Sequence, residues 1–390
     1  MQKMVRRPVK HRIAVDLRPF LNLRTGVGKY QVSLMRAITQ LTADVDYLAF
    51  NVFDWQRVTS AHYEPAPVIG DVKHSATQLL LSIRLVRKAC QILRAGFYRA
   101  TVPYVRPDFF HAFLYRPPSF SSLPFVPVIY DLSNKRFPQH HPIERIRWME
   151  GLDKQISSVP VIHTISEFTA KEIVDYYGVD RQKIVVATPG VDDVFFRTAS
   201  VSATMAKHDL TADLYFLCVG TLEPRKNLAT LIRAYAQCPA PIQQRFPLVL
   251  AGMKGWSRAT MPKEAERLIQ SGSLRLLGYV SDDELRDLYA SARAMFYPSM
   301  YEGFGMPIAE ARAAGARIIA SDIPPHHEAS CGVGLFVETM NIDRWSEALS
   351  DASQSSGLSD TRGSDSLTWE VAALQTMEIY RRAGNAFNIR

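Results

Sequence analysis

The 390-residue sequence is poor in cysteine and lacks any long hydrophobic run. Its four cysteines stand far apart and none forms a CxxC pair, which excludes a disulfide framework and a zinc knuckle. The most apolar stretches, such as 214–220 and 246–253, are far too short to span a bilayer. The basic segment 1–16 also has no apolar core of the kind a signal peptide needs. We therefore expect a cytoplasmic protein in a reducing setting, neither inserted in a membrane nor exported by such segments.

Acidic residues are scarce in the first half of the chain. Residues 1–200 hold 27 Lys and Arg against 17 Asp and Glu, a balance of +10, whereas residues 201–390 hold 19 against 21, a balance of −2. Residues 72–107 contain seven cations and no acid, interleaved with leucine, isoleucine and valine. This pattern predicts either a basic amphipathic helix for an anionic membrane surface or polyphosphate-bearing partner, or a helix packed on its own domain with a solvated basic face. The cations come without a nucleic-acid-binding motif, which argues against nucleic acid as a partner.

Short β-branched and aromatic runs alternate with longer helical patterns, which is typical of parallel α/β architecture. The pattern is lost over 197–212, which is rich in Ser, Thr and Ala, and then begins again. We predict one domain over 1–200, a second over 201–367 and a terminal helix over 368–390 that docks back. Two Rossmann-like sheets of this kind imply a central cleft, with ligands at the carboxyl ends of the strands.

The first motif with chemical content runs from a predicted strand through a glycine-flanked loop into a helix, and reads EGFGMPIAEARAAG over 302–315. Pro307 suits the first turn of a helix, whose free N–H groups attract anions. Gly303 and Gly305 allow a ligand to approach the backbone. Glu302 and Glu310 could each accept two hydrogen bonds from a vicinal diol of a sugar nucleotide. The alternative is that Glu310 only complements the helix dipole and Glu302 is an exposed loop acid.

The second motif, VGTLEPRKNL over 219–228, places two adjacent cations at a helix start directly after a predicted strand. A diphosphate leaving group gains negative charge as its bond to a sugar breaks, and fixed cations such as Arg225 and Lys226 stabilise that charge. Either cation alone could instead be a solvated helix-capping charge. The pair in one turn favours a phosphate site.

Together these motifs resemble the family 4 retaining glycosyltransferases of the GT-B fold, in particular bacterial mannosyltransferase-like members that assemble O-antigen or exopolysaccharide. The Glu-x7-Glu pair and EPRKN are the specific signals. Further similarity covers almost the whole chain, including RTGVGKY, VIYDLSNKRFPQHHP, ISEFTAKEI, TPGVD, GYVSDDEL, SDIPPHHEA and WEVAALQTMEIYRRA.

The resemblance implies a role for individual residues. Glu302 would bind the donor sugar's hydroxyls, helped by the backbone of Gly303 to Met306, with the amides of Phe304 and Gly305 foremost, and Glu310 would bind the nucleotide's ribose. Arg225 and Lys226, beside Gly220, would bind the donor diphosphate. Other contacts would come from Gly26 and Gly28, which face the diphosphate from the N-terminal acceptor domain, and from Tyr279 and Val280, which contact the base.

The chain departs from the family pattern at two positions. Many members have a histidine before an aspartate at the end of an N-terminal strand, where it touches the donor sugar; here the pair is Tyr130 and Asp131. We place both in the catalytic group, with Tyr130 able to donate a hydrogen bond but not to titrate near neutral pH. Thr221 stands where many members have a phosphate-binding arginine, a role that Arg225 would take over.

The resemblance implies no metal and no cofactor beyond the nucleotide-sugar substrate. Gln31 occupies the third glycine position of a dinucleotide fingerprint, which argues against NAD. The adjacent pairs His140–His141 and His326–His327 cannot both face one metal from a helix, although His141 or His326 could touch sugar hydroxyls.

We thus expect a retaining hexosyltransferase that moves mannose from GDP-mannose onto a lipid-diphosphate-linked or growing glycan, in the cytoplasm or peripherally on the inner membrane face. The alternatives are a UDP-sugar donor, a non-catalytic partner in a polysaccharide-assembly complex, and a sugar-nucleotide epimerase on a related fold.

Overall fold

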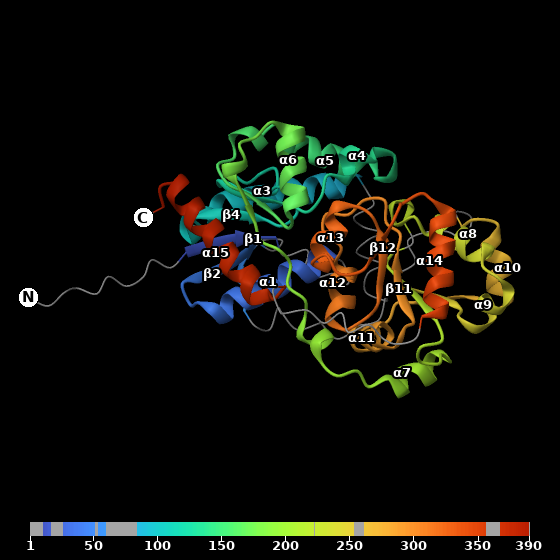
Figure 1. Cartoon of the computed structure of the whole chain (residues 1–390). Helices are drawn as coiled ribbons and strands as arrows, with labels where there is room; N and C mark the ends of the chain where they lie inside the picture. Colours follow the sequence, from blue (N-terminus) through green and yellow to red (C-terminus); the bar gives the residue numbers. More distant parts are fainter. Residues whose placement is uncertain are drawn as a thin grey trace, which may run out of the picture.

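The computed structural model describes residues 11–16, 26–50, 54–59, 84–221, 223–252, 261–355 and 367–389. Figure 1 shows two α/β domains side by side, each built on its own sheet. Within the described residues, the first sheet has the strand order β3-β2-β1-β4-β5-β6-β7 and the second the order β10-β9-β8-β11-β12-β13. All neighbouring strands are parallel except β2 and β3. In each sheet the strands are first added toward one edge and later toward the other edge, so the strand order reverses between β1 and β4 and between β8 and β11. Ligands bind at such reversal points in open α/β sheets.

The first domain consists of strands and helices up to residue 200. Its strands are β1 (His11–Val15), β2 (Val45–Phe50), β3 (Trp55–Arg57), β4 (Phe109–Ala112), β5 (Phe125–Ile129), β6 (Ile162–Thr164) and β7 (Ile184–Val186). Its helices are α1 (Gly26–Leu41), α3 (Arg84–Val105), α4 (Ser133–Arg136), α5 (Ile143–Asp153) and α6 (Glu167–Tyr177). The helix α3 lies within the basic segment 72–107, of which residues 72–83 are outside the described residues.

The second domain repeats the alternation of strands and helices. Its strands are β8 (Phe216–Val219), β9 (Leu248–Ala251), β10 (Leu274–Gly278), β11 (Ala294–Tyr297), β12 (Ile318–Ser321) and β13 (Leu335–Val337). Its helices are α7 (Val201–His208), α8 (Leu228–Gln237), α9 (Ala240–Arg245), α10 (Glu264–Gln270), α11 (Asp282–Ser291), α12 (Met306–Ala313), α13 (Pro324–Ser330) and α14 (Ile342–Gln354).

Local sequence signals explain several helix ends. Ser166 caps α6 by accepting a hydrogen bond from the Thr169 amide, and Gly178 ends the same helix in the left-handed conformation at φ 64°. Ser281 and Glu284 form a complete capping box at the start of α11. These predicted caps are confirmed.

The segment 197–212, where the apolar pattern is lost and we placed the domain boundary, contains the helix α7. This helix packs against α11 of the second sheet's domain. Its alanine- and serine-rich sequence gives little amphipathic contrast, so the sequence pattern did not reveal it.

The terminal helix α15 (Trp369–Ala386) returns to the first domain and packs on α1 and β7. The Tyr380 and Tyr47 hydroxyls form a hydrogen bond of 2.8 Å, and the Trp369 indole donates to Asp192 over 2.6 Å. The predicted docking of the last helix is therefore present.

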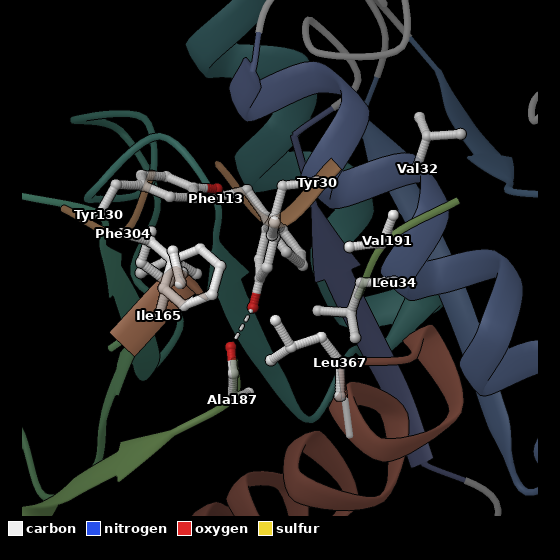
Figure 2. Packing of buried hydrophobic residues seen from close by; sticks show 14 of the residues in the cluster. Tyr30, Val32, Leu34, Phe113, Tyr130, Ile165, Ala187, Val191, Phe304 and Leu367 are labelled. Atoms are coloured by element: carbon white, nitrogen blue, oxygen red, sulfur yellow. Dashed lines mark hydrogen bonds between the residues drawn. The ribbon is translucent and has the colours of Figure 1, made fainter. Parts of the chain in front are cut away.

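A buried apolar cluster crosses from one domain to the other. Phe304 of the second domain packs beside Ile165 and Tyr130 of the first (Figure 2). The two domains therefore share a packed contact close to the ends of β5 and β11. Among the described residues, no helix is both long and apolar enough to cross a membrane.

Candidate active site

The two predicted motifs meet at the point where the second sheet reverses its strand order. The 219–228 motif follows β8, and the 302–315 motif follows β11, its neighbour in the sheet. The Met300 amide donates a hydrogen bond of 2.8 Å to the Arg225 carbonyl, which ties the two loops together. Their charged side chains therefore converge in one place.

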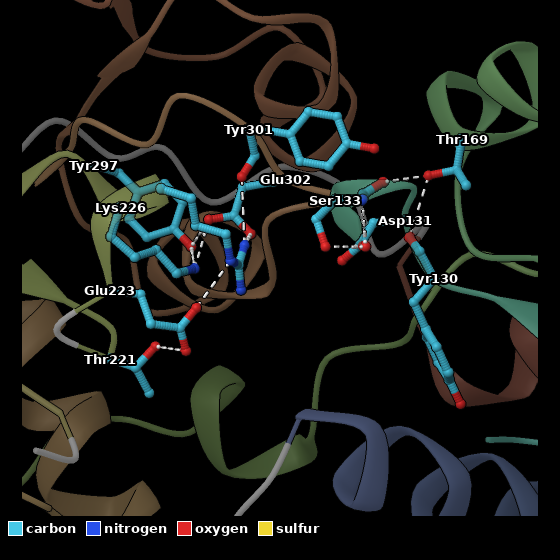
Figure 3. Close-up of polar contacts among 12 residues, drawn as sticks. Tyr130, Asp131, Ser133, Thr169, Thr221, Glu223, Lys226, Tyr297, Tyr301 and Glu302 are labelled. Atoms are coloured by element: carbon cyan, nitrogen blue, oxygen red, sulfur yellow. Dashed lines mark hydrogen bonds and ion pairs between the residues drawn. The ribbon is translucent and has the colours of Figure 1, made fainter. Parts of the chain in front are cut away.

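Glu302 forms the centre of this place. Its Oε1 accepts hydrogen bonds from the Lys226 ammonium (2.5 Å) and the Tyr297 hydroxyl (2.9 Å), and its Oε2 accepts one from the Arg225 guanidinium (2.8 Å) (Figure 3). The Glu302 side chain is 9% exposed and that of Lys226 10%. Burial by itself would raise the pKa of Glu302, but Lys226 and Arg225 outweigh it and hold the pKa below its usual range. Glu302 is therefore an ionised carboxylate that is largely shielded from solvent.

Arg225 is held from its other side by Glu223. The Glu223 carboxylate accepts from Arg225 Nε over 3.0 Å and from the Thr221 hydroxyl over 2.9 Å. Lys226 also donates to the Tyr297 hydroxyl over 2.8 Å. The two cations are thus fixed in orientation by neighbouring carboxylates and a phenol, which is the arrangement that favours rapid stabilisation of a developing negative charge.

Glu310 lies in α12 and has different partners. The helix starts after Gly305, which adopts φ 112°, and carries Pro307 in its first turn. The Glu310 carboxylate is 8% exposed, and its Oε1 lies 3.3 Å from the Lys29 ammonium of α1. Burial raises the pKa of Glu310, and Lys29 opposes that effect. Both glutamates are therefore buried, and Glu302 is not an exposed loop acid.

The first domain meets this loop at Gly303. A Cβ atom at this position would lie 1.9 Å from the Tyr130 carbonyl oxygen, so only glycine fits. The Gly303 carbonyl accepts hydrogen bonds from the Thr169 hydroxyl (3.1 Å) and the Ser166 hydroxyl. Gly303 therefore works as a close domain contact as well as a part of the loop next to Glu302.

Tyr130 is placed differently from the prediction. We expected its hydroxyl near the donor sugar, but the ring turns away from Glu302 (Figure 3) and packs edge-on between Tyr30 and Tyr115, with centroid distances of 5.6 and 5.8 Å. Its hydroxyl is buried and has no hydrogen-bond partner among the described residues. The physical reason is the aromatic core of the first domain, which takes up the ring.

Asp131 faces the cluster across the domain contact. Its Oδ1 accepts hydrogen bonds from the Ser133 amide (2.9 Å) and hydroxyl (2.6 Å). It is close enough to Arg225 for the carboxylate to raise the pKa of that guanidinium. The aspartate, more than the tyrosine before it, is therefore positioned at the site.

The remaining predicted residues lie around this centre. Gly220 borders a mainly apolar cavity of about 170 Å³ at the carboxyl ends of β8, β9 and β10. Tyr279, 59% exposed, and the buried Val280 directly follow that edge. Gly26 and Gly28 open α1, whereas the preceding turn residues 17–25 lie outside the described residues. Met306, partly buried, begins α12.

The structure also brings in residues that the sequence analysis did not assign. Tyr297, Glu223 and Lys29 each bind a predicted site residue. Tyr297 ends β11 at the reversal point, which is a signal that could have pointed to it. The role of Glu223 depends on the conformation of its turn, and that of Lys29 on the position of the first domain relative to the second. A sequence motif reveals neither.

The structure defines the surroundings of His141 and His326, for which the sequence analysis left a contact with sugar hydroxyls open. His326 is fully buried and bonds the Ser321 carbonyl through Nδ1 over 2.9 Å, while burial lowers its pKa to about 4. Burial also lowers the pKa of His141, which lies near Asp131, Arg145 and Arg225. Neither belongs to a metal cluster: no group of three or more His, Cys, Asp or Glu that could hold a metal occurs in the described part of the chain.

Comparison with known proteins agrees with this geometry. Residues 24–195 match Glycosyltransferase Family 4, and residues 202–363 match Glycosyl transferases group 1. The chain is 32% identical over 265 residues to O-antigen chain mannosyltransferase B of Escherichia coli, covering 66% of this chain and 70% of that protein. It is 30% identical over 174 residues to serotype-specific mannosyltransferase WbdA of Escherichia coli, covering 42% of this chain but only 20% of that protein.

The fold is also found in solved structures. Sucrose-phosphate synthase from Thermosynechococcus elongatus aligns with a TM-score of 0.68 and 16% identity, over 97% of this chain and all of that one. At this identity the likeness shows the GT-B fold alone. Taken with the sequence matches, it shows that the chain belongs to the family 4 glycosyltransferases, in their mannosyltransferase-like group.

Proposed function

We propose that this protein is a retaining mannosyltransferase that transfers mannose from GDP-mannose to a lipid-diphosphate-linked or growing glycan of a bacterial surface polysaccharide. The observation that carries the proposal is the ionised Glu302 held between Arg225 and Lys226 at the end of β11. Relatives named as O-antigen mannosyltransferases support the choice of sugar.

The cluster suits a nucleotide-sugar donor on both sides of the bond that breaks. Glu302 accepts hydrogen bonds from sugar hydroxyls, and the neighbouring Arg225 and Lys226 bind the diphosphate. In a front-face transfer the bond between the anomeric carbon and the phosphate oxygen breaks while the acceptor oxygen bonds to the same face. The acceptor proton passes to the leaving phosphate, so the reaction is balanced without a metal or a further protein base.

A donor screen tests the proposal. The purified protein is incubated with GDP-mannose and with several UDP-sugars, and nucleotide release is measured by chromatography with and without a glycan acceptor. We expect turnover with GDP-mannose. Turnover with a UDP-sugar alone would reassign the donor, and conversion of the donor without any acceptor would favour an epimerase. No turnover and no binding of GDP or UDP would favour a non-catalytic partner.

Two isosteric variants assign the chemistry to the site. Glu302→Gln keeps the shape but removes the charge, and we expect its turnover to fall by about 100-fold or more, since a charge-assisted bond to the donor is lost. Glu347→Gln makes the same change at a carboxylate of α14 that is 60% exposed, and it should leave turnover unchanged. Full activity in Glu302→Gln would contradict the assignment.

We further propose that α3 lies on an anionic membrane surface, which would bring the first domain to a lipid-linked acceptor. The helix exposes large apolar side chains, with Leu93 at 55%, Phe97 at 48% and Tyr104 at 86%. Their spacing of four and seven residues puts them on one side of the helix. Arg99 and Arg106 are exposed nearby. Anionic lipid surfaces bind helices that expose apolar side chains next to cations and carry no acidic residues.

Vesicle sedimentation tests this second proposal. We expect the protein to pellet with phosphatidylglycerol vesicles but to stay in the supernatant with phosphatidylcholine vesicles. Added salt should release it from the phosphatidylglycerol vesicles. The double variant Leu93→Ser/Phe97→Ser should stay in solution. Leu374→Ser changes a leucine of α15 that is 54% exposed and should still pellet. Binding that ignores lipid charge and salt would contradict the electrostatic part.

A further inference from the structure

Lys29 makes a charged contact across the two domains. Its ammonium nitrogen, carried by α1 of the first domain, lies 3.3 Å from Glu310 Oε1 and 3.4 Å from Asp282 Oδ2 of the second domain. It also lies 3.3 Å from Asp192 Oδ2 and 5.1 Å from the centroid of the Phe195 ring. One ammonium group therefore faces three carboxylates.

The carboxylate most affected by this contact is that of Glu310. Glu310 is buried, and the groups that face it are Lys29 from α1, Asp192 from the segment after β7, and Asp282 and Tyr289 from α11. Burial, Asp282 and Asp192 all raise the pKa of Glu310, and Lys29 is the group that opposes them. Removing the ammonium would leave three carboxylates together, which favours the protonated form of Glu310.

Asp192 keeps the ammonium in place. Its Oδ1 accepts hydrogen bonds from the Trp369 indole of α15 (2.6 Å) and from the Ser33 hydroxyl of α1 (3.3 Å), so its Oδ2 points to Lys29. Asp282 starts α11 after the N-cap Ser281, close in the chain to Tyr279 and Val280, which the family resemblance places at the nucleotide base. Lys29 thus joins the first domain, the terminal helix and two elements beside the proposed nucleotide site.

We propose that Lys29 is a positioning residue that keeps Glu310 ionised and oriented to accept hydrogen bonds from the ribose hydroxyls of the donor nucleotide. An ionised carboxylate accepts from both hydroxyls of a vicinal diol, whereas a protonated one must use an oxygen as a donor. Lys29 of the first domain therefore contributes to nucleotide binding without itself touching the nucleotide. This inference rests on the proposed function and on the ribose role of Glu310.

The test is calorimetric binding of GDP, UDP and 2′,3′-dideoxy-GDP between pH 6 and 8.5. In Lys29→Met we expect the dissociation constant for GDP to rise about tenfold at neutral pH, and to recover as rising pH ionises Glu310. Binding of the dideoxy nucleotide, which has no ribose diol, should change by less than about twofold. Lys29→Arg should restore most of the affinity for GDP.

Two controls separate positioning from a general loss of structure. Glu310→Gln should weaken GDP binding at every pH, and Lys29→Met/Glu310→Gln should bind no more weakly than Glu310→Gln alone. Lys171→Met changes an exposed lysine of α6 and should bind like the wild type. If the wild type binds neither GDP nor UDP, the proposed function fails and this inference fails with it. If the wild type binds and Lys29→Met binds equally well at each pH, or loses the dideoxy nucleotide to the same extent, only the inference is overturned.

Discussion

Replacing Gly303 by alanine should separate the two domains at the site. The added Cβ atom would lie 1.9 Å from the Tyr130 carbonyl oxygen, whereas real Cβ contacts essentially never fall below 3.0 Å, so the two backbones must move apart by at least 1.1 Å. That displacement breaks the hydrogen bonds from Thr169 and Ser166 to the Gly303 carbonyl. At about 0.5–1.5 kcal/mol for each bond, the domain contact loses about 1–3 kcal/mol. Glu302, the residue before Gly303, moves with the loop.

The expected result is a fall in donor turnover of about 100-fold, because a shift of about 1 Å at a reacting group has an effect of that size. Turnover is measured by nucleotide release, and small-angle scattering should show a larger radius of gyration than in the wild type. Gly96→Ala is the matched control, since an added Cβ there meets nothing within 4 Å. Gly303→Ala with wild-type turnover and an unchanged radius would refute the reasoning that this contact sets the geometry of Glu302.

Three further variants test single features. Ser281→Ala removes one half of the capping box of α11 and should lower the free energy of unfolding by about 1 kcal/mol in urea titrations, with Ser202→Ala, at an exposed position of α7, as a neutral comparison. Tyr130→Phe removes a buried hydroxyl without a described partner and should raise the unfolding free energy or leave it unchanged; a drop in turnover at unchanged stability would show that the hydroxyl meets substrate after all. Because the pKa of folded Glu302 lies below that of the unfolded chain, its charge stabilises the fold above about pH 4.5, and this contribution is lost as the pH falls. The difference in unfolding free energy between the wild type and Glu302→Gln should therefore shrink between pH 5 and 3.5, and a constant difference would contradict the lowered pKa.

The sequence predicts those parts of the site that depend on neighbouring strands. Arg225 and Glu302 are far apart in the chain, but each follows a strand at the reversal point of one sheet, and such strand ends must meet. The cap at Ser281 was predictable for a similar reason, since it depends on four consecutive residues. Local patterns and parallel-sheet topology are thus enough to place the charged centre.

Contacts between the domains were not predictable in the same way. Lys29 faces Glu310 only because the two sheets, formed by different halves of the chain, pack with one particular orientation. The Tyr130 ring was misplaced in the prediction because the motif fixes its backbone at the end of β5, while the aromatic packing with Tyr30 and Tyr115 decides where the ring points. The helix α7 was missed because its stability comes from packing on α11 and not from its own pattern.

The proposed function requires the half of the chain with a balance of −2 to bind an anionic nucleotide, and the local charges of the centre suit this role. Two cations, Arg225 and Lys226, are matched there by two carboxylates, Glu223 and Glu302, so these charges compensate one another. In the proposed function, both cations are oriented by these carboxylates before the donor binds, and they would share their hydrogen bonds between its diphosphate and the carboxylates. In the same proposal, the sugar hydroxyls would supply Glu302 with new hydrogen-bond donors. Local preorganisation, not net charge, therefore supports donor binding, and the +10 of the first half is available for an anionic acceptor or membrane.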